Sequence, residues 1–169
     1  EIYKIAFQKF KSDNRYDLII FSESFQYIPM KAALNNAIFH LNSKGYIIIS
    51  DFFQIDAEGK SPLGGGHKFN KWEKLYSTFQ IELKYSKDIT KETAPTIDFL
   101  DQFCQEVLNP LGKMTGEYMH SNYPKITQII QWKFKKKLNK INKRYLSGEV
   151  NGTYFKKFKT YRLLLYKNG

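Results

Sequence analysis

Two continuous apolar segments, with a helical pattern between them, constrain the fold more than any other feature of this sequence. Residues 16–22 (YDLIIFS) and 46–50 (YIIIS) are apolar at successive positions, which is typical of strands buried on both faces of a parallel sheet. Between them, apolar residues recur every three or four positions from Met30 to Leu41, behind Pro29, which predicts a helix. This order predicts a right-handed βαβ unit and an α/β fold.

The remainder of the chain predicts further helices and strands joined by loops. Residues 64–66 are three consecutive glycines, but no phosphate-binding Lys-Ser/Thr pair follows them, so a flexible loop over a cleft is the favoured interpretation. In chain order we expect a loop at 54–67, a helix at 69–76, a strand at 79–87, a helix ending at 109–112, a second helix after Pro124 and a last strand at 161–166. With 169 residues and 42% hydrophobic content, the chain can form one packed domain.

The chain is strongly basic, with 27 Lys and Arg residues against 16 Asp and Glu residues. Such a charge is common in proteins that bind nucleic acid. The most basic segment, residues 132–144, places apolar residues on one helical face and most lysines on the others. A solvated helix face is therefore the first interpretation of this segment, attraction of a negatively charged acceptor the second, and nucleic-acid binding the third.

Several features of the sequence argue against a membrane span, a secretory signal, an internal disulfide and a metal site. No apolar run approaches the roughly 20 residues that cross a bilayer, and residues 1–10 lack the pattern of a secretory signal. Cys104, the single cysteine, lies in a helical apolar stripe and is predicted to be a buried, inert thiol. The histidines and the cysteine lack ligand spacing, so no metal site is expected. We expect a soluble, cytoplasmic protein, whose oligomeric state the sequence does not specify.

Two blocks of the sequence resemble the class I S-adenosylmethionine-dependent methyltransferases. Residues 16–28 (YDLIIFSESFQYI) are similar to the fourth strand of that family and the turn after it, and residues 41–51 (LNSKGYIIISD) are similar to its fifth strand. The run at 161–166 fits the antiparallel seventh strand. The resemblance implies a Rossmann-like, mostly parallel sheet with an antiparallel last strand. It also implies one partial methyltransferase-like domain over residues 1–169, with a helical insertion at about 90–151.

The same resemblance implies an activity. S-adenosylmethionine would be the cofactor, and its methyl group would pass to oxygen or nitrogen of a small-molecule or glycan-type acceptor. The residues DIT at 88–90 and TAPT at 93–96 are similar to segments of bacterial small-molecule and sugar methyltransferases. The helical insertion would then act as a lid that sets acceptor choice, or as a packing subdomain without acceptor contacts.

The sequence departs from this family in its cofactor motif. The family uses a glycine-rich turn after the first strand and an acidic residue after the second, and neither can be placed before Tyr16. Residues 2–10 leave room for a remnant of the third strand at most. We therefore expect the chain to be the C-terminal two-thirds of such an enzyme, with poor cofactor affinity and an exposed sheet edge. Two alternatives stay open: a non-catalytic methyltransferase-like binding module within a complex, and an RNA methyltransferase.

The resemblance places one group of candidate site residues in the turn after the first expected strand. Ser22, Glu23, Ser24 and Tyr27 would lie beside the methionine part of the cofactor and face the acceptor. Glu23 could orient or deprotonate the acceptor, because methyl transfer to an alcohol or amine needs alignment and a base. Glu23 could equally cap the following helix, where a carboxylate is favoured by the helix dipole.

A second group of candidates follows the second expected strand. Asp51 and Phe52 lie where ligands of open α/β sheets bind, so we expect acceptor contacts there, although Asp51 is equally suited to stabilising a turn. His67 follows the glycine loop and is the histidine best placed to act as a general base towards the acceptor. The alternative for His67 is an exposed loop residue without a catalytic role.

Overall fold

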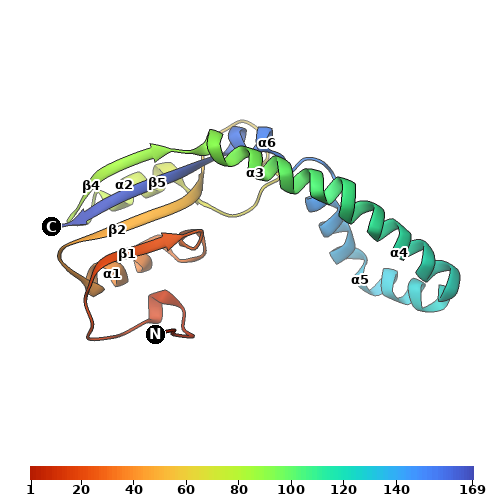
Figure 1. Cartoon of the computed structure of the whole chain (residues 1–169), viewed down its shortest axis with the longest axis horizontal. Helices are drawn as coiled ribbons and strands as arrows, with labels where there is room; N and C mark the ends of the chain where they lie inside the picture. Colours follow the sequence, from red (N-terminus) through yellow and green to blue (C-terminus); the bar gives the residue numbers. More distant parts are fainter. The chain divides into compact units, whose positions relative to one another are not determined.

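The computed structural model describes the backbone of residues 1–169 and the side chains of all residues except 144 and 145. The chain divides into two compact units. Figure 1 shows the chain coloured by residue number. The first, called here the sheet unit, contains Glu1–Gly59, Gly64–Glu92 and Phe158–Gly169. The second, called here the helical unit, contains Lys60–Leu63 and Thr93–Lys157, and so includes most of the insertion expected at 90–151.

The sheet unit is built on a mixed sheet with the strand order β1-β2-β5-β4 (Figure 1). β1 and β2 are parallel, with Ile19 opposite Ile47, whereas β5 runs antiparallel to both β2 and β4. The short β3 pairs with the end of β2. The strands are β1 (Tyr16–Ser22), β2 (Leu41–Gln54), β3 (His67–Lys68), β4 (Ile81–Asp88) and β5 (Lys159–Asn168). The predicted βαβ unit and the antiparallel last strand are both confirmed.

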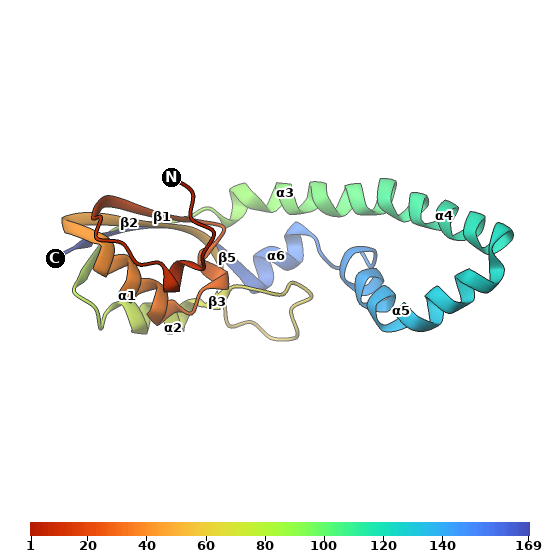
Figure 2. The ribbon, with the colours of Figure 1, turned by 90° about the horizontal axis from the view of Figure 1, so that it is seen from below.

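Two helices, α1 (Met30–His40) and α2 (Phe69–Tyr76), lie on one face of this sheet (Figure 2). The core between them and the strands is dominated by large apolar side chains, each of which stabilises the fold by about 2–3 kcal/mol when fully buried. Trp72 of α2 is at its centre, and its indole N–H donates to the Tyr166 hydroxyl at 2.9 Å. The most buried members are Phe25, Leu34, Ile47, Ile49, Phe53, Trp72, Leu164 and Tyr166.

The other face of the sheet carries exposed apolar side chains. On β1 and β2, Leu18, Ile20 and Tyr46 are 38–58% exposed, while the alternate residue Phe21 is buried in the core. Within the described chain, β1 is also an edge strand that pairs only with β2. Strands of parallel sheets are normally covered on both faces. Here one face and the β1 edge are instead exposed to water, and together they form an apolar surface.

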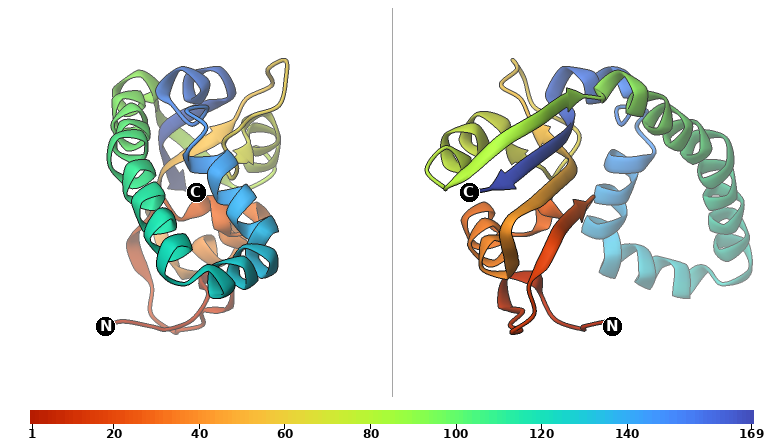
Figure 3. Two further views of the ribbon diagram at one scale, coloured as in Figure 1. Left: turned by 90° about the vertical axis from the view of Figure 1, so that its right-hand side faces the viewer. Right: turned by 60° about the vertical axis from the view of Figure 1, so that its left-hand side comes forward.

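The helical unit is dominated by one long continuous helix, after which the chain turns back (Figure 3). α3 (Thr90–Phe103) passes through a π-helical turn, η3 (Cys104–Leu108), directly into α4 (Asn109–Asn122). The prediction that a helix ends at 109–112 is therefore wrong. Pro110 is the second residue of α4, and the π-helical turn directly before it has the altered hydrogen-bond pattern that accommodates a ring and a missing N–H inside a continuous helix. α5 (Pro124–Tyr145) and α6 (Gly152–Phe158) complete the unit.

Three local expectations are corrected by the structure. Residues 2–10 form no strand but contain one 3₁₀ turn, η1 (Phe7–Lys9). After α1 the left-handed residue is Lys44, with φ 65°, rather than Gly45. Gly45 instead allows a close approach of the backbone: a Cβ there would lie in tight contact, 3.0 Å from the Asn42 carbonyl oxygen. Cys104 is only partly buried, because the apolar stripe of its helix is exposed.

Candidate functional site

The candidate site lies at the edge of the sheet where the parallel strands β1 and β2 end. Ligands of open α/β sheets bind at the carboxyl ends of such strands. The turn of residues 22–28 leaves β1 there, and it contains the short 3₁₀ helix η2 (Phe25–Tyr27). The end of β2, from Ser50 to Phe52, lies beside this turn, because Ser22 is opposite Ser50 in the register. We call this region the carboxyl-edge site.

Glu23 occupies the centre of this turn in a strained conformation. Its φ is 52°, in the left-handed region that costs a non-glycine residue about 1–2 kcal/mol. The conformation is held by its backbone N–H, which donates to the Ser50 carbonyl oxygen at 2.9 Å, and by its carboxylate, which accepts from the Tyr161 hydroxyl. The side chain therefore faces β5. The first helix residue of η2 is preceded by Ser24, and α1 by Pro29, so Glu23 caps neither helix.

Tyr161 is a site residue that the sequence reasoning missed. Its hydroxyl lies 3.5 Å from Ser50 Oγ in addition to its bond to Glu23. Burial, and next the hydrogen bond to Glu23, raise the pKa of Tyr161 to about 12. The phenol therefore stays neutral at physiological pH and acts as a hydrogen-bond donor that fixes the Glu23 carboxylate. The position of Tyr161 follows from its pairing with Phe52 across β2 and β5, which no local pattern could reveal.

Asp51 holds the turn to the end of β2. It is 1% exposed, and its carboxylate accepts hydrogen bonds from the Gln26 backbone N–H at 2.9 Å, the Gln26 side-chain amide at 3.2 Å and the Phe52 N–H at 2.8 Å. Burial raises the pKa of Asp51, although the hydrogen bonds from the backbone N–H groups of Gln26 and Phe52 act in the opposite direction. Of the two roles considered for Asp51, this geometry favours turn stabilisation, because its oxygens are already engaged by the protein. Gln26 was not singled out from the sequence.

His67 is held in place by the same turn. Its Nε2 lies 3.1 Å from the Phe25 carbonyl oxygen and 2.9 Å from the Ile28 carbonyl oxygen. Carbonyl oxygens only accept hydrogen bonds, so Nε2 must carry a proton and donate. That nitrogen is therefore not available to take a proton from an acceptor, and the ring serves to connect β3 with the turn after β1. The role of His67 as a general base stays a prediction that this contact does not favour.

The glycine loop packs against Phe52. Gly65 and Gly66 have φ values of 75° and 78°. A Cβ on Gly65 would lie 2.7 Å from Gln26 Oε1, and one on Gly66 would lie 3.0 Å from the Phe52 carbonyl oxygen, so neither position accepts a side chain. Gln54 holds the loop by donating from its amide to the Gly65 and Gly66 carbonyl oxygens, at 3.0 and 2.8 Å. The loop therefore packs against the candidate site and is held there by hydrogen bonds, whereas the sequence indicated a flexible loop.

Lys159 is the second residue that holds the loop. Its buried ammonium donates to the Gly65 carbonyl oxygen at 2.6 Å and lies 3.4 Å from that of Gly64. It also stands 5.3 Å from the centre of the Phe52 ring, in cation–π contact. Burial lowers the pKa of Lys159 to about 8. No acidic side chain pairs with it among the described residues, so the ammonium depends on carbonyl oxygens and a ring for its stabilisation.

The remaining candidates are accessible to a ligand. Ser22 and Tyr27 are exposed and Ser24 is half-buried, all within the turn that carries Glu23. The structure thus brings Ser22, Glu23 and Ser24 together with Tyr161 and Ser50 at one edge. In the described part of the chain, no group of three or more His, Cys, Asp or Glu side chains is arranged to hold a metal ion. Nor does any helix of that part combine the length and apolar character needed to cross a bilayer.

Several solved structures that superpose on this chain are methyltransferases. The O-methyltransferase of a trans-AT PKS multienzyme of Brevibacillus brevis, solved with S-adenosyl-L-homocysteine, superposes with a TM-score of 0.57 and 17% identity over 100% of this chain. Coclaurine N-methyltransferase, bound to N-methylheliamine and SAH, gives a TM-score of 0.57 and 12% identity over 99% of this chain. The chain has the class I methyltransferase fold. It spans 49% and 53% of the lengths of these two proteins.

The methyltransferase fold does not fix the reaction. The (4+2)-cyclase SpnF matches with a TM-score of 0.56 and 13% identity, over 97% of this chain and 54% of its own length. No family model and no curated protein sequence matches the chain. At these identities the likeness establishes the fold, and an activity must be argued from the site itself.

Proposed function

We propose that this chain is the acceptor-side half of an S-adenosylmethionine-dependent methyltransferase that acts on oxygen or nitrogen of a small-molecule or glycan-type acceptor. The observation that carries the proposal is the strained Glu23, fixed by Tyr161 and the Ser50 carbonyl at the carboxyl ends of β1 and β2. Strain of this kind is retained where a side chain must be aimed at a ligand. The same fold in solved methyltransferases supports the assignment of the reaction class.

The residues at this edge fit part of the cofactor. The Ser22 and Ser24 hydroxyls are hydrogen-bond acceptors suited to an ammonium group, such as that of the methionine moiety, and Tyr27 adds an exposed ring. In the described residues of the sheet unit, Gly64–Gly66 after β2 lie against Gln26 and Phe52, so this glycine run leaves no room for the nucleoside part. The nucleoside would therefore be bound by a segment other than residues 1–169, joined to β1 at its free edge.

The chemistry asks little of the chain beyond alignment and proton removal. When bound, S-adenosylmethionine supplies a methyl group on a positively charged sulfur, which leaves as a neutral thioether. The Glu23 carboxylate orients the acceptor and takes the proton that its hydroxyl or amine loses. Tyr161 donates to one carboxylate oxygen and leaves the other for the acceptor, and Asp51 keeps the turn in position through Gln26.

Two alternatives rest on specific observations. The chain spans about half the length of the solved methyltransferases and exposes the outer face of its sheet, which favours a non-catalytic module that binds a partner. The formal net charge of +11 favours an RNA acceptor. An RNA methyltransferase would bind RNA with an affinity that falls steeply as salt is added, because phosphate contacts release counterions.

The decisive experiment is calorimetric titration of S-adenosylhomocysteine into the product of the complete reading frame, alongside the 169-residue chain. Micromolar binding by the full product and none by the chain supports the proposal. Failure of the full product to bind contradicts it and leaves the binding module as the better reading. In a binding-competent protein, Glu23→Gln is expected to lower kcat by about 10²-fold or more while leaving S-adenosylhomocysteine affinity within a few-fold.

A further inference from the structure

The glycine loop, residues 64–66, is attached to the carboxyl-edge site by hydrogen bonds from two side chains. Residues 55–66 join β2 to β3 and belong to no helix or strand of the described chain. Gln54 donates from its amide to two carbonyl oxygens of the glycine loop, at 3.0 and 2.8 Å, and Lys159 donates from its ammonium to one of them at 2.6 Å. Glycines change backbone conformation at little steric cost, and segments held by few contacts open locally far more readily than a whole domain unfolds.

The closed glycine loop occupies the space beside Phe52. A Cβ on Gly66 would lie 3.0 Å from the Cδ2 atom of the Phe52 ring, and one on Gly65 would lie 3.4 Å from its Cζ atom. The same Cβ on Gly65 would lie 2.7 Å from Oε1 of Gln26, the residue that Asp51 holds at the turn after β1. Phe52 is the residue for which acceptor contacts are expected. An acceptor that is to cover this ring therefore requires the glycine loop to move.

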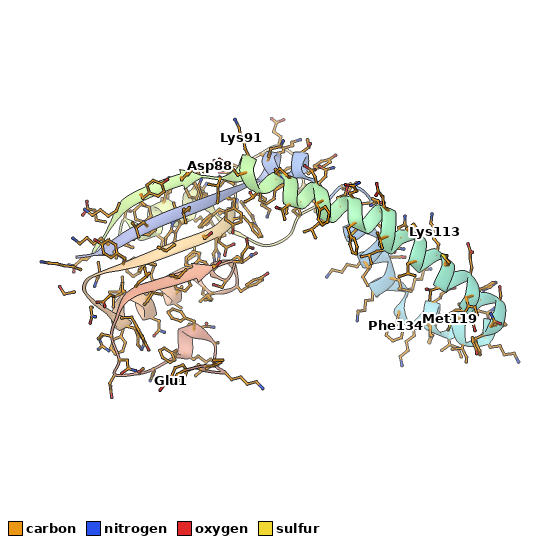
Figure 4. The ribbon with its side chains drawn as sticks, in the orientation of Figure 1. Glu1, Asp88, Lys91, Lys113, Met119 and Phe134 are labelled. Carbon is orange, nitrogen blue, oxygen red and sulfur yellow. The ribbon has the colours of Figure 1, made fainter. Side chains whose placement is uncertain are left out.

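The ammonium that holds the glycine loop is a buried charge without an ion-pair partner among the described residues. Lys159 is 1% exposed and contacts the loop carbonyls and the Phe52 ring. Asp88, labelled in Figure 4, marks this end of the sheet, because it accepts from the hydroxyl of Thr160, the residue after Lys159. Burying a charge without an opposite charge is unfavourable, so the closed loop is less stable than it would be over a neutral side chain.

The other titratable groups near Lys159 do not neutralise it. The acidic groups on the surrounding elements are bonded elsewhere or exposed: Asp51 accepts from Gln26 and Phe52, Glu23 from Tyr161, Asp56 pairs with Lys68, and Glu58 is exposed. The remaining groups are His67, whose Nε2 donates to two backbone carbonyls, and the cations Lys60, Lys156, Lys157 and Arg162. Burial is accordingly the cause of the lowered pKa of Lys159.

We propose that the glycine loop is a gate over the acceptor side of the carboxyl-edge site, held closed by Gln54 and Lys159 and opened to admit the acceptor. The assignment to the acceptor rests on the proposed function, whereas the opening itself does not. Opening removes the carbonyl oxygens from the ammonium and exposes it to water. The charge of Lys159 therefore lowers the cost of opening and keeps the gate ready to open at neutral pH.

The pH dependence of the gate follows from the same burial. Lys159 has a pKa of about 8 in the closed protein, and hydration in the open protein returns the pKa towards 10.5. The open protein thus binds the proton more tightly than the closed protein does. Opening is easiest below about pH 8 and becomes rarer as pH rises from 8 towards 10.5.

Trace labelling with acetic anhydride measures this opening on the unaltered chain, because the buried Lys159 amine reacts only when the gate is open. The reference is Lys87, which is exposed on β4, and mass spectrometry resolves the individual lysines. The reactivity of Lys159 relative to Lys87 is expected to fall by roughly tenfold or more between about pH 7.5 and about pH 9.5. A relative reactivity that stays constant or rises over this range would overturn the proposal.

Two variants identify the glycine loop as the moving part. Gln54→Ala removes both amide hydrogen bonds to the loop and is expected to raise the relative reactivity of Lys159 by about tenfold at both pH values. The matched control is Gln102→Ala, which removes an amide hydrogen bond to Glu106 in the helical unit and should change nothing.

Gly65→Ala is the second variant, because its Cβ does not fit the closed loop, and it should raise the reactivity of Lys159 as Gln54→Ala does. Circular dichroism checks that each variant is folded, so the test stands if either one folds. Wild-type reactivity in a folded variant of either kind would contradict the gate.

Failure of the gate can be told apart from failure of the proposed function. The labelling needs neither cofactor nor acceptor, whereas S-adenosylhomocysteine binding by the product of the complete reading frame tests the reaction class. In that product, Gln54→Ala is expected to leave S-adenosylhomocysteine affinity within a few-fold, because the gate covers the acceptor side. A loss of this affinity that parallels the rise in Lys159 labelling would show that the loop serves the cofactor, and it would overturn the assignment of the gate to the acceptor.

Discussion

At the scale of single residues, Glu23 shows how the candidate site stores conformational strain. The left-handed backbone is held by the Ser50 carbonyl and by the Tyr161 hydroxyl. Replacing Glu23 with glycine removes the strain and the carboxylate together, whereas replacing it with alanine removes the carboxylate and keeps the strain. We expect Glu23→Gly to be about 1 kcal/mol more stable than Glu23→Ala in urea unfolding. Equal stability of the two variants would show that the turn relaxes and that the backbone is not strained.

Lys159 makes the stability of the sheet unit vary with pH in the alkaline range. Burial lowers its pKa to about 8 from the ordinary 10.5, so between these values the unfolded chain binds the proton that the folded chain has lost. This group therefore makes the fold more stable as pH rises from about 8 towards 10.5. From pH 8 to 10.5 the melting temperature of Lys159→Met is expected to fall relative to that of the wild type, because the variant lacks this contribution. The exposed Lys156→Met variant should retain the wild-type dependence.

Some residues of the candidate site could be predicted from the sequence, and others could not. Glu23 could be found because it directly follows a strand whose apolar pattern is plain in residues 16–22. Tyr161 and Lys159 could not be found, because they enter the site only through the register that places them opposite Phe52 and Gln54. The roles of Asp51 and His67 were likewise open until their hydrogen-bond partners, Gln26 and two backbone carbonyls, were known.

At the scale of elements, Asp88 joins the end of β4 to the start of α3. Its carboxylate accepts from the Thr90 backbone N–H at 2.9 Å and from the Thr160 hydroxyl at 3.1 Å, and it lies 3.2 Å from the Arg162 guanidinium. Burial raises the pKa of Asp88, but the hydrogen bonds from Thr90 and the charge of Arg162 outweigh it, so the pKa is lowered overall.

This contact predicts an acid-sensitive contribution to stability. A lowered folded-state pKa stabilises the protein above the ordinary aspartate range, and the contribution is lost as pH falls through the folded-state value. Asp88→Asn is expected to destabilise the chain by about 1–2 kcal/mol at pH 7, from the loss of charge-assisted hydrogen bonds. Urea unfolding of both proteins at pH 7 and pH 3 measures the difference, which should shrink at pH 3. A gap that persists at low pH would contradict this account.

The helical elements show where periodicity misleads. The apolar stripe and Pro110 both indicated that a helix stops near residue 109, yet the chain continues through a π turn into α4. Proline is compatible with a first turn as well as with a stop, and sequence spacing cannot distinguish the two. In contrast, α1 and α2 were predicted closely, because each has a single apolar face that packs on the sheet.

For the whole molecule, the exposed outer face of the sheet is expected to promote self-association in solution. Ile20 on β1 is 58% exposed and belongs to an apolar surface with Leu18 and Tyr46. We expect the 169-residue chain to self-associate through this surface, and Ile20→Lys to reduce that association without lowering the melting temperature. Light scattering over a concentration series measures the change. The matched control is Phe39→Lys, which removes a 57% exposed apolar side chain on α1 and should leave self-association unaltered.

The place of β5 in the sheet has a consequence for synthesis on the ribosome. β5 is translated last among the strands, yet it lies between β2 and β4 and forms the whole link between them. While it is still in the exit tunnel, β1 and β2 can pair, but β4 has no neighbour, and residues 93–157 emerge with only their own helical contacts to make. The nascent chain therefore carries an unfinished sheet until residues 159–168 have left the tunnel, and its unpaired strands are prone to aggregation during that interval.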